Sequence, residues 1–196
     1  MKKVFCILCF IVFLLGVAQQ NTHAQEVRNA IKINPLSIFL LTGNMQYERA
    51  IGKHTSVQAG FFYSALNLKW DGKGLEYRGF GFTPEFRYYV LPQQTALNGL
   101  YVAPFIRLQR FKVLVDDNAS GLPSSENSGT VTNSKMGVNV GYQAVLGKSF
   151  VIDLFGGPTV GVSRLTGTLL DYKLPGIGIG SGGVGFRFGV CLGAAF

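Results

Sequence analysis

The chain has 196 residues, a length that fits one domain with a sizeable hydrophobic core. Charged residues make up only 14% of it, against about 25% in an ordinary soluble domain, whereas glycine (26 residues) and phenylalanine (16 residues) are abundant. This composition argues against a typical water-soluble protein.

The first 24 residues have the pattern of a secretory signal peptide. The basic start MKK precedes the apolar run VFCILCFIVFLLGVA, and Ala24 supplies a small residue before the expected cleavage site. The run is short for a membrane-spanning helix, and no later stretch approaches the roughly 18 consecutive apolar residues that such a helix needs. We therefore expect an exported protein with a signal peptide at residues 1–24 and one mature domain at residues 25–196.

Alternation of apolar and polar residues dominates the mature chain and predicts β-strands. Eight strands are expected, at residues 30–40, 45–49, 55–66, 77–91, 100–114, 132–146, 150–164 and 184–196. We find no helical periodicity of useful length and no internal repeat.

The predicted connections alternate in length. The tight ones lie at residues 51–54, 92–99 and 147–149, and the long polar ones at residues 67–76, 115–131 and 165–181. The connection after the first strand is also short and breaks this pattern once. Long loops at one end of a barrel and short turns at the other are typical of outer-membrane barrels, with the turns in the periplasm.

The alternation fits two architectures, a soluble barrel with its apolar residues inside and a membrane barrel with its apolar residues outside. The polar face is mostly Gly, Ser, Asn, Gln and Thr, whereas a water-facing surface would need Lys and Glu. Small polar residues suit the narrow, filled interior of an eight-stranded barrel. We therefore expect an all-β, eight-stranded antiparallel up-and-down transmembrane β-barrel, with the soluble barrel as the alternative.

Two segments carry a family resemblance. NAIKINPLS with MQYERAIGKH, and GFTPEFRYYV, are similar to an uncharacterised family of outer-membrane barrels described as a domain of unknown function. The whole mature chain resembles the small OmpA/OmpX type. The resemblance implies a place in the cell outer membrane, a structural or surface-interacting role, and no catalytic residues or cofactors to carry over. Its implied partners are outer-membrane lipids and, during assembly, the barrel-insertion machinery.

The expected inward faces carry seven charged residues, namely Lys32, Glu48, Glu85, Arg87, Arg107, Asp153 and Arg187. A buried ion without a partner is costly, so we expect these residues to form a structural ion-pair network that fills the barrel. Lys135 is expected near the outer mouth. A gated narrow pore is the alternative role for the same set of charges.

Arg187 and Phe196 belong to the last predicted strand, VGFRFGVCLGAAF. Arg187 is expected to face the lumen with Glu48, Glu85 or Asp153 as its partner, because a slip of one residue would turn it onto lipid. Phe196, a terminal aromatic after alternating apolar residues, resembles the signal that the outer-membrane insertion machinery recognises. This strand is also expected to close the barrel against the first.

His54 carries the enzymatic alternative. The spacing in HTS superficially matches a lipid-modifying enzyme that uses a Ser with a His and an acid. However, His54 falls in a predicted periplasmic turn, whereas a lipid A deacylase needs its catalytic residues at the outer leaflet. We expect a solvated turn histidine and no enzyme.

The remaining motifs are weaker. GIGSGG at 178–183 fits G-x-G-x-x-G, but this fingerprint has meaning only between a strand and a helix of a βαβ unit. Cys191 is the only cysteine outside the signal peptide, so we expect no internal disulfide, and no residue spacing suggests a metal site.

The basic net charge of +8 leaves nucleic acid and anionic lipid as possible partners. Asp116, Asp117 and Glu126 make the 115–131 loop acidic, so an outward nucleic-acid patch is not expected. This loop is instead the candidate contact for an extracellular partner. Lys53 and Lys148, in the turns, are placed to meet lipid headgroups.

Overall fold

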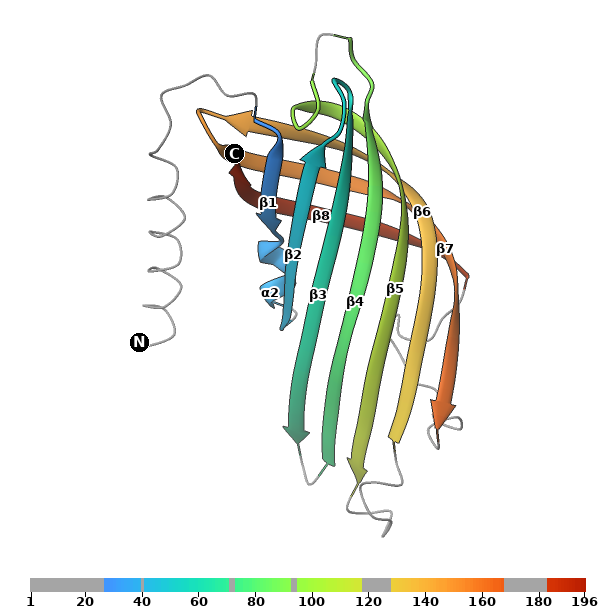
Figure 1. Ribbon diagram of the computed structural model, residues 1–196. Helices are drawn as coiled ribbons and strands as arrows, with labels where there is room; N and C mark the ends of the chain where they lie inside the picture. Colours follow the sequence, from blue (N-terminus) through green and yellow to red (C-terminus); the bar gives the residue numbers. More distant parts are fainter. Residues whose placement is uncertain (1–26, 40, 71–72, 93–94, 118–127, 168–182) are drawn as a thin grey trace, which may run out of the picture.

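The computed structural model describes residues 27–39, 41–70, 73–92, 95–117, 128–167 and 183–196 (Figure 1). The expected signal peptide therefore lies outside the described residues. The eight strands are β1 (Asn29–Ile33), β2 (Thr42–Ala50), β3 (Thr55–Trp70), β4 (Lys73–Tyr89), β5 (Gly99–Asp117), β6 (Ser128–Leu146), β7 (Phe150–Gly167) and β8 (Gly183–Ala195). One short helix, α2 (Pro35–Phe39), lies between β1 and β2. Within the described residues, no helix has the length and apolar character needed to cross a membrane.

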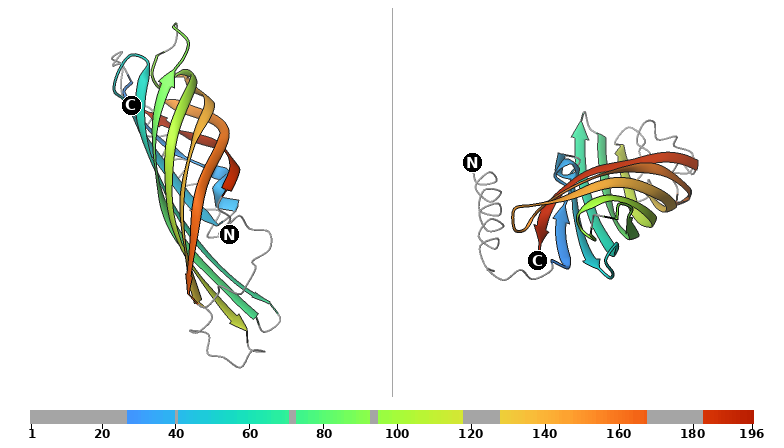
Figure 2. Two further views of the ribbon diagram at one scale, coloured as in Figure 1. Left: turned by 90° about the vertical axis from the view of Figure 1, so that its right-hand side faces the viewer. Right: turned by 90° about the horizontal axis from the view of Figure 1, so that it is seen from above.

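The strands form a closed barrel. Each pairs antiparallel with its neighbours in chain order, and β8 pairs with β1. Figure 2 shows how the strands curve round the barrel and how the longer ones run on past one end. The predicted all-β, eight-stranded up-and-down architecture is confirmed.

The two faces of the strands have opposite chemistry. Lys32 and Arg87 point inward and are fully buried, whereas Phe61 and Phe80 point outward and keep 53% and 61% of their surface exposed. A soluble barrel buries its apolar side chains inside, so the predicted alternative of a soluble barrel is wrong. Apolar residues outside and polar residues inside are the pattern of a transmembrane barrel.

The apolar outer band has the height of a membrane. On β4 its outward residues run from Tyr88 to Phe80, and Arg78 follows on the same face. This span matches the roughly 9–11 tilted residues that a strand needs to cross the hydrocarbon core.

The first predicted strand is shorter than expected. It was predicted at residues 30–40, but β1 ends at Ile33 and α2 begins at Pro35. Asn34 caps this helix, because its side-chain oxygen accepts a hydrogen bond from the Ser37 backbone N–H at 3.2 Å. Proline is favoured at the first helical position, since it has no N–H to donate and its φ suits a helix.

Three predicted loops are partly strands. Residues 67–76 were expected to be a polar loop, but β3 and β4 stay paired as far as Trp70 and Lys73. Likewise β5 continues to Asp117, β6 begins at Ser128, and β7 reaches Gly167. Residues 118–127 and 168–182 of the predicted loops lie outside the described residues. A strand ladder depends on backbone hydrogen bonds, which polar residues make as well as apolar ones. A prediction from apolar alternation therefore misses strand extensions with a polar sequence.

The turn end of the barrel is closed by the connection between β4 and β5. Leu97 in this connection is 1% exposed and packs with Ala30, Val151 and Ala195. Its backbone has a φ of 73°, which is uncommon for a residue with a branched side chain. The Gln143 amide donates a hydrogen bond to the Leu97 carbonyl at 3.0 Å. The connection at 92–99, predicted as a simple turn, therefore closes the turn end of the lumen. The connections at 51–54 and 147–149 are tight turns, as expected.

The last strand closes the barrel against the first, as predicted. The pairs run from Ala30 with Ala195 to Ile33 with Leu192. The Phe196 N–H donates to the Asn29 carbonyl at 2.8 Å, and the Asn29 N–H donates to the Phe196 carbonyl at 2.9 Å. Gly193 permits this closure, because a Cβ there would lie 2.8 Å from the Lys32 Cα.

Candidate functional site

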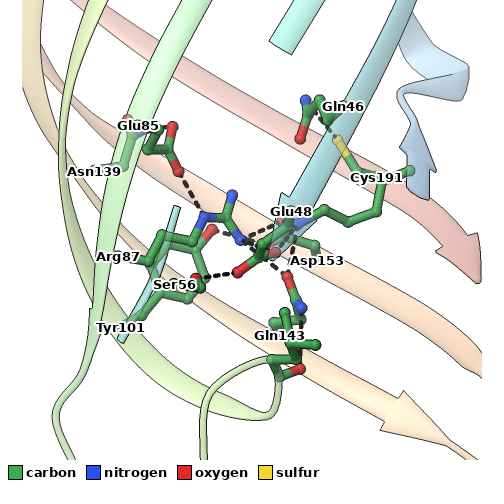
Figure 3. Close-up of polar contacts among 12 residues, drawn as sticks. Gln46, Glu48, Ser56, Glu85, Arg87, Tyr101, Asn139, Gln143, Asp153 and Cys191 are labelled. Atoms are coloured by element: carbon green, nitrogen blue, oxygen red, sulfur yellow. Dashed lines mark hydrogen bonds and ion pairs between the residues drawn. The ribbon is translucent and has the colours of Figure 1, made fainter. Parts of the chain in front are cut away.

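Four charged side chains meet in the turn-side half of the lumen (Figure 3). The Lys32 ammonium lies 2.6 Å from Glu48 Oε2 and 2.7 Å from Asp153 Oδ2. Arg87 Nη1 lies 3.2 Å and 2.8 Å from the same two oxygens. All four side chains are fully buried. Two cations therefore share two carboxylates, and the group is electrically neutral.

Four different strands supply this group. Lys32 comes from β1, Glu48 from β2, Arg87 from β4 and Asp153 from β7. Each occupies an inward position of its strand, and an eight-stranded barrel is narrow enough for side chains from distant strands to meet. The alternation of the sequence predicts the inward positions, and closure of the barrel brings these residues together.

Neutral side chains complete the bonding of Glu48. Its Oε1 accepts hydrogen bonds from the Ser56 hydroxyl at 2.5 Å and from the Tyr89 hydroxyl at 2.9 Å. Its Oε2 is occupied by the two cations. Both oxygens of this buried carboxylate are thus satisfied, as a charge removed from water requires.

Asp153 is bonded in the same way. Its Oδ1 accepts a hydrogen bond from the Tyr101 hydroxyl at 2.7 Å, and the Arg87 guanidinium carbon lies 4.2 Å from the centre of the Tyr101 ring. The Gln143 side-chain oxygen accepts hydrogen bonds from Lys32 at 2.7 Å and Arg87 at 2.9 Å. Sequence reasoning missed these polar partners, although each stands on the same inward face as the charges.

Glu85 extends the group toward the loop side. Its Oε1 accepts a hydrogen bond from Arg87 Nε at 2.8 Å, and its Oε2 accepts from Arg187 at 3.0 Å and from Asn139 at 3.1 Å. The Arg187 guanidinium carbon lies 4.6 Å from the ring centres of both Phe105 and Phe155. Glu85 is therefore the partner of Arg187 among the three carboxylates that the sequence offered.

The inner network is our name for these six charged residues: Lys32, Glu48, Glu85, Arg87, Asp153 and Arg187. Its three cations balance its three carboxylates. Every carboxylate oxygen in it accepts at least one hydrogen bond. The Arg87 Nη2 is buried without a hydrogen-bond partner, so the carboxylates are satisfied more fully than the cations. A buried polar network with its carboxylates satisfied in this way is suited to holding a barrel in one register.

Arg107, the seventh predicted residue, lies apart from the inner network. Its guanidinium carbon lies 5.1 Å from the centre of the Phe62 ring, and its Nε is buried without a hydrogen-bond partner. In the strand register it stands directly opposite Lys135. Among the described residues no ion pair engages Arg107 or Lys135, so the loop-side half of the lumen carries surplus positive charge.

His54 and Ser56, the two residues of the HTS motif that could act together, are not hydrogen-bonded to each other in the described structure. The Ser56 hydroxyl instead donates to Glu48, and the His54 Nδ1 is buried without a hydrogen-bond partner. His54 also accepts a backbone hydrogen bond from Tyr89 at 2.8 Å through its carbonyl. The structure thus places this histidine in the expected turn between β2 and β3, but half-buried rather than solvated.

Cys191 lies in the lumen wall and is fully buried, with the Gln46 amide nitrogen 3.2 Å from its sulfur. Most of the GIGSGG segment lies outside the described residues, and its last glycine, Gly183, begins β8. No cluster of potential metal ligands occurs within the described part of the chain. Phe196 is exposed at the outer surface.

The loop end of the molecule is an extension of five strands. The pairing of β2 with β3 stops at Thr42 and Ser64, and that of β7 with β8 stops at Gly161 and Gly183. Beyond these points β3 to β7 continue together, and in Figure 1 they reach well below β2. On the inner face of this extension Phe111 stacks on Tyr77, with ring centres 5.0 Å apart.

Comparison with known proteins identifies a family and similar solved structures. A profile of the family described as "Protein of unknown function (DUF3575)" matches residues 6–163. No curated protein matches the chain. Among solved structures, Ail, the attachment invasion locus protein of Yersinia pestis, matches with 12% identity and a TM-score of 0.48 over 87% of this chain and 98% of that one. Because the family profile covers well over half of the sequence, this chain belongs to the DUF3575 family.

Proposed function

We propose that the protein is a non-catalytic barrel of the outer membrane that presents its five-stranded extension and the adjoining loops to a partner at the cell surface. The observation that carries this proposal is the extension itself. A membrane span accounts for about 9–11 residues of each strand, whereas β5 and β6 each have 19. The additional length needs a role outside the bilayer.

The edges of the extension support a binding role. Residues 66–70 of β3 pair with β4 alone, and residues 162–167 of β7 pair with β6 alone, among the described residues. An edge strand offers unpaired backbone N–H and C=O groups, onto which an extended segment of another protein adds as a further strand. A surface partner with an extended segment therefore fits this end of the molecule.

The packed lumen supports a structural role for the charges. The inner network is neutral and buried, and Leu97 lies across the turn end. Each carboxylate of the inner network accepts hydrogen bonds at both of its oxygens. A filled eight-stranded interior leaves little room for a pore. This packing favours a non-conducting barrel.

The experiment that tests the proposal labels single cysteines on intact cells with a membrane-impermeant maleimide. The labelling sites are Thr166→Cys on β7 and Lys148→Cys in the turn before β7, both of them exposed positions. We expect Thr166→Cys to react on intact cells and Lys148→Cys to react only after the outer membrane is permeabilised. The reverse pattern, or release of the protein from membranes by carbonate, would contradict the proposal.

A further inference from the structure

The outer face of the barrel changes from apolar to basic at the loop-side boundary of the apolar band. On β4, Arg78 follows Phe80, and on β5, Arg110 follows Leu108. On β7, Arg164 follows Val162. In each case the two residues are next to each other on the outward face, and all are exposed. The cations thus begin where the membrane-facing surface ends.

The strand register fixes how these cations are spaced. Arg110 on β5 stands opposite Thr132 on β6, which in turn stands opposite Arg164 on β7. Strands lie about 4.8 Å apart, so the two arginines are separated by about 10 Å, with a threonine hydroxyl between them. Lys112 lies two residues beyond Arg110 on the same face and opposite Arg78. These four cations, Arg78, Arg110, Lys112 and Arg164, are called the basic belt.

Within the described residues, one member of the basic belt forms an ion pair with a carboxylate. Arg78 Nε lies 2.5 Å from Glu76 Oε1, with 64% of the Arg78 side chain exposed. No ion pair engages Arg110, Lys112 or Arg164 among the described residues. Like charges directly opposite each other on neighbouring strands are destabilising. Arg78 and Lys112 stand opposite each other with Glu76 as their one described carboxylate, so this pair keeps a net positive charge that favours an anion from outside the chain.

We propose that the basic belt binds the phosphate groups of anionic lipid headgroups in the membrane leaflet on the loop side. Headgroups begin where the apolar band ends, and this is the level at which the belt lies. Guanidinium groups bind phosphate through paired hydrogen bonds, and the Thr132 hydroxyl adds a donor between Arg110 and Arg164. The inference rests on the membrane location in the proposed function, and adds to it the lipid class and the residues that bind it.

The turn side of the barrel supplies a matched control. Arg49, Lys53 and Lys148 are also exposed cations, and Lys53 and Lys148 are expected from the sequence to meet lipid headgroups. Lys53 and Lys148 stand in turns rather than on a continuous sheet face, so they lack the regular spacing of the basic belt. Removing three cations from either end changes the net charge equally. A difference between the two triple variants therefore reports on the arrangement of the belt and not on total charge.

The experiment places the full barrel in nanodiscs of phosphatidylcholine with a minor fraction of phosphatidylglycerol. Native mass spectrometry then counts the anionic lipids that remain on the released protein. The wild type is compared with the Arg110→Gln, Lys112→Gln, Arg164→Gln variant and with the Arg49→Gln, Lys53→Gln, Lys148→Gln control. One basic side chain near an anionic surface raises the binding constant by about fivefold. The phosphatidylglycerol enrichment of the belt variant should therefore be at least about fivefold lower than that of the wild type.

The results separate this inference from the proposed function. A large loss in the belt variant, a small loss in the control and a weaker enrichment at about 1 M salt support it. Equal losses in both variants, or no enrichment by the wild type, overturn it while leaving a membrane barrel in place. Failure of the wild type to enter bilayers would instead overturn the proposed function. The Arg110→Lys, Arg164→Lys variant, which keeps the charge, should retain most of the enrichment and shows that the mutated surface still folds.

Discussion

Lys32 and Arg87 share the same oxygen of Asp153, at 2.7 Å and 2.8 Å, although they come from strands β1 and β4 of the barrel. Both also reach Glu48 Oε2. The two cations are held close together only because two carboxylates lie between them. This arrangement ties the first, second, fourth and seventh strands to one point in the lumen.

The first prediction compares two buried arginines. Arg87→Gln removes a cation from the inner network and leaves Glu48, Glu85 and Asp153 with insufficient positive charge, so it should lower the free energy of unfolding by about 3–5 kcal/mol. Arg107→Gln removes a cation that pairs with no described carboxylate, so it should change the free energy of unfolding by less than about 1 kcal/mol. A urea series read by the heat-modifiable gel shift measures both. Equal losses would contradict the account of the network.

The second prediction concerns coupling between Lys32 and Asp153. Removing either charge alone leaves a buried ion without its partner, whereas removing both keeps the inner network neutral. The double variant Lys32→Met, Asp153→Leu should therefore be more stable than the sum of the single effects implies, with a coupling of about 1–3 kcal/mol. The same urea series on the four proteins gives this value. Additive effects would show that the two charges do not act together.

The third prediction compares two glycines. A Cβ on Gly193 would collide with the carbonyl oxygen of Ile31, so Gly193→Ala should hinder the pairing of β8 with β1. A Cβ on Gly43 would have only the Tyr63 carbonyl near it, at 3.8 Å, so Gly43→Ala should assemble normally. The fraction of folded barrel after refolding into detergent distinguishes the two variants. A normally assembled Gly193→Ala barrel would show that β1 and β8 do not close as described.

The fourth prediction concerns Leu97 and the closed turn end. Leu97→Ala should lower the free energy of unfolding by about 2–5 kcal/mol, because it empties a packed position among Ala30, Val151 and Ala195. It should not create conductance in a planar bilayer, since the inner network still fills the lumen. Steady ionic current through this variant would favour the pore alternative instead.

The sequence was sufficient to predict which way each strand faces. Strand periodicity is local, so the inward positions of Lys32, Glu48 and Asp153 follow from their neighbours alone. The small polar residues and glycine on the other face also favoured apolar residues outward, because they suit a filled interior. The burial of Lys32 and Arg87 and the exposure of Phe61 and Phe80 then decided against the soluble barrel.

Other features depend on contacts between distant strands. The partners of the charges, such as Tyr101 and Gln143, could not be selected before the register was known. The closure of the turn end at Leu97 follows from burial at the end of the barrel rather than from the turn-like sequence around it. The extension of β3 and β4 past Leu66 depends on backbone pairing, which polar residues conceal from a hydrophobicity pattern.

The central claim is that the apolar face of the strands contacts lipid. Spin labels at Phe80, Phe82, Phe86 and Tyr88 of β4, in the barrel reconstituted in bilayers, test it most directly through their collision rates with oxygen and with a water-soluble nickel complex. We expect high oxygen and low nickel accessibility at these four outward positions, with the deepest label at Phe82 or Phe86. A label at Thr166 on the extension should show high nickel accessibility. High nickel accessibility at Phe82 and Phe86 would contradict the claim, because those side chains would then face water.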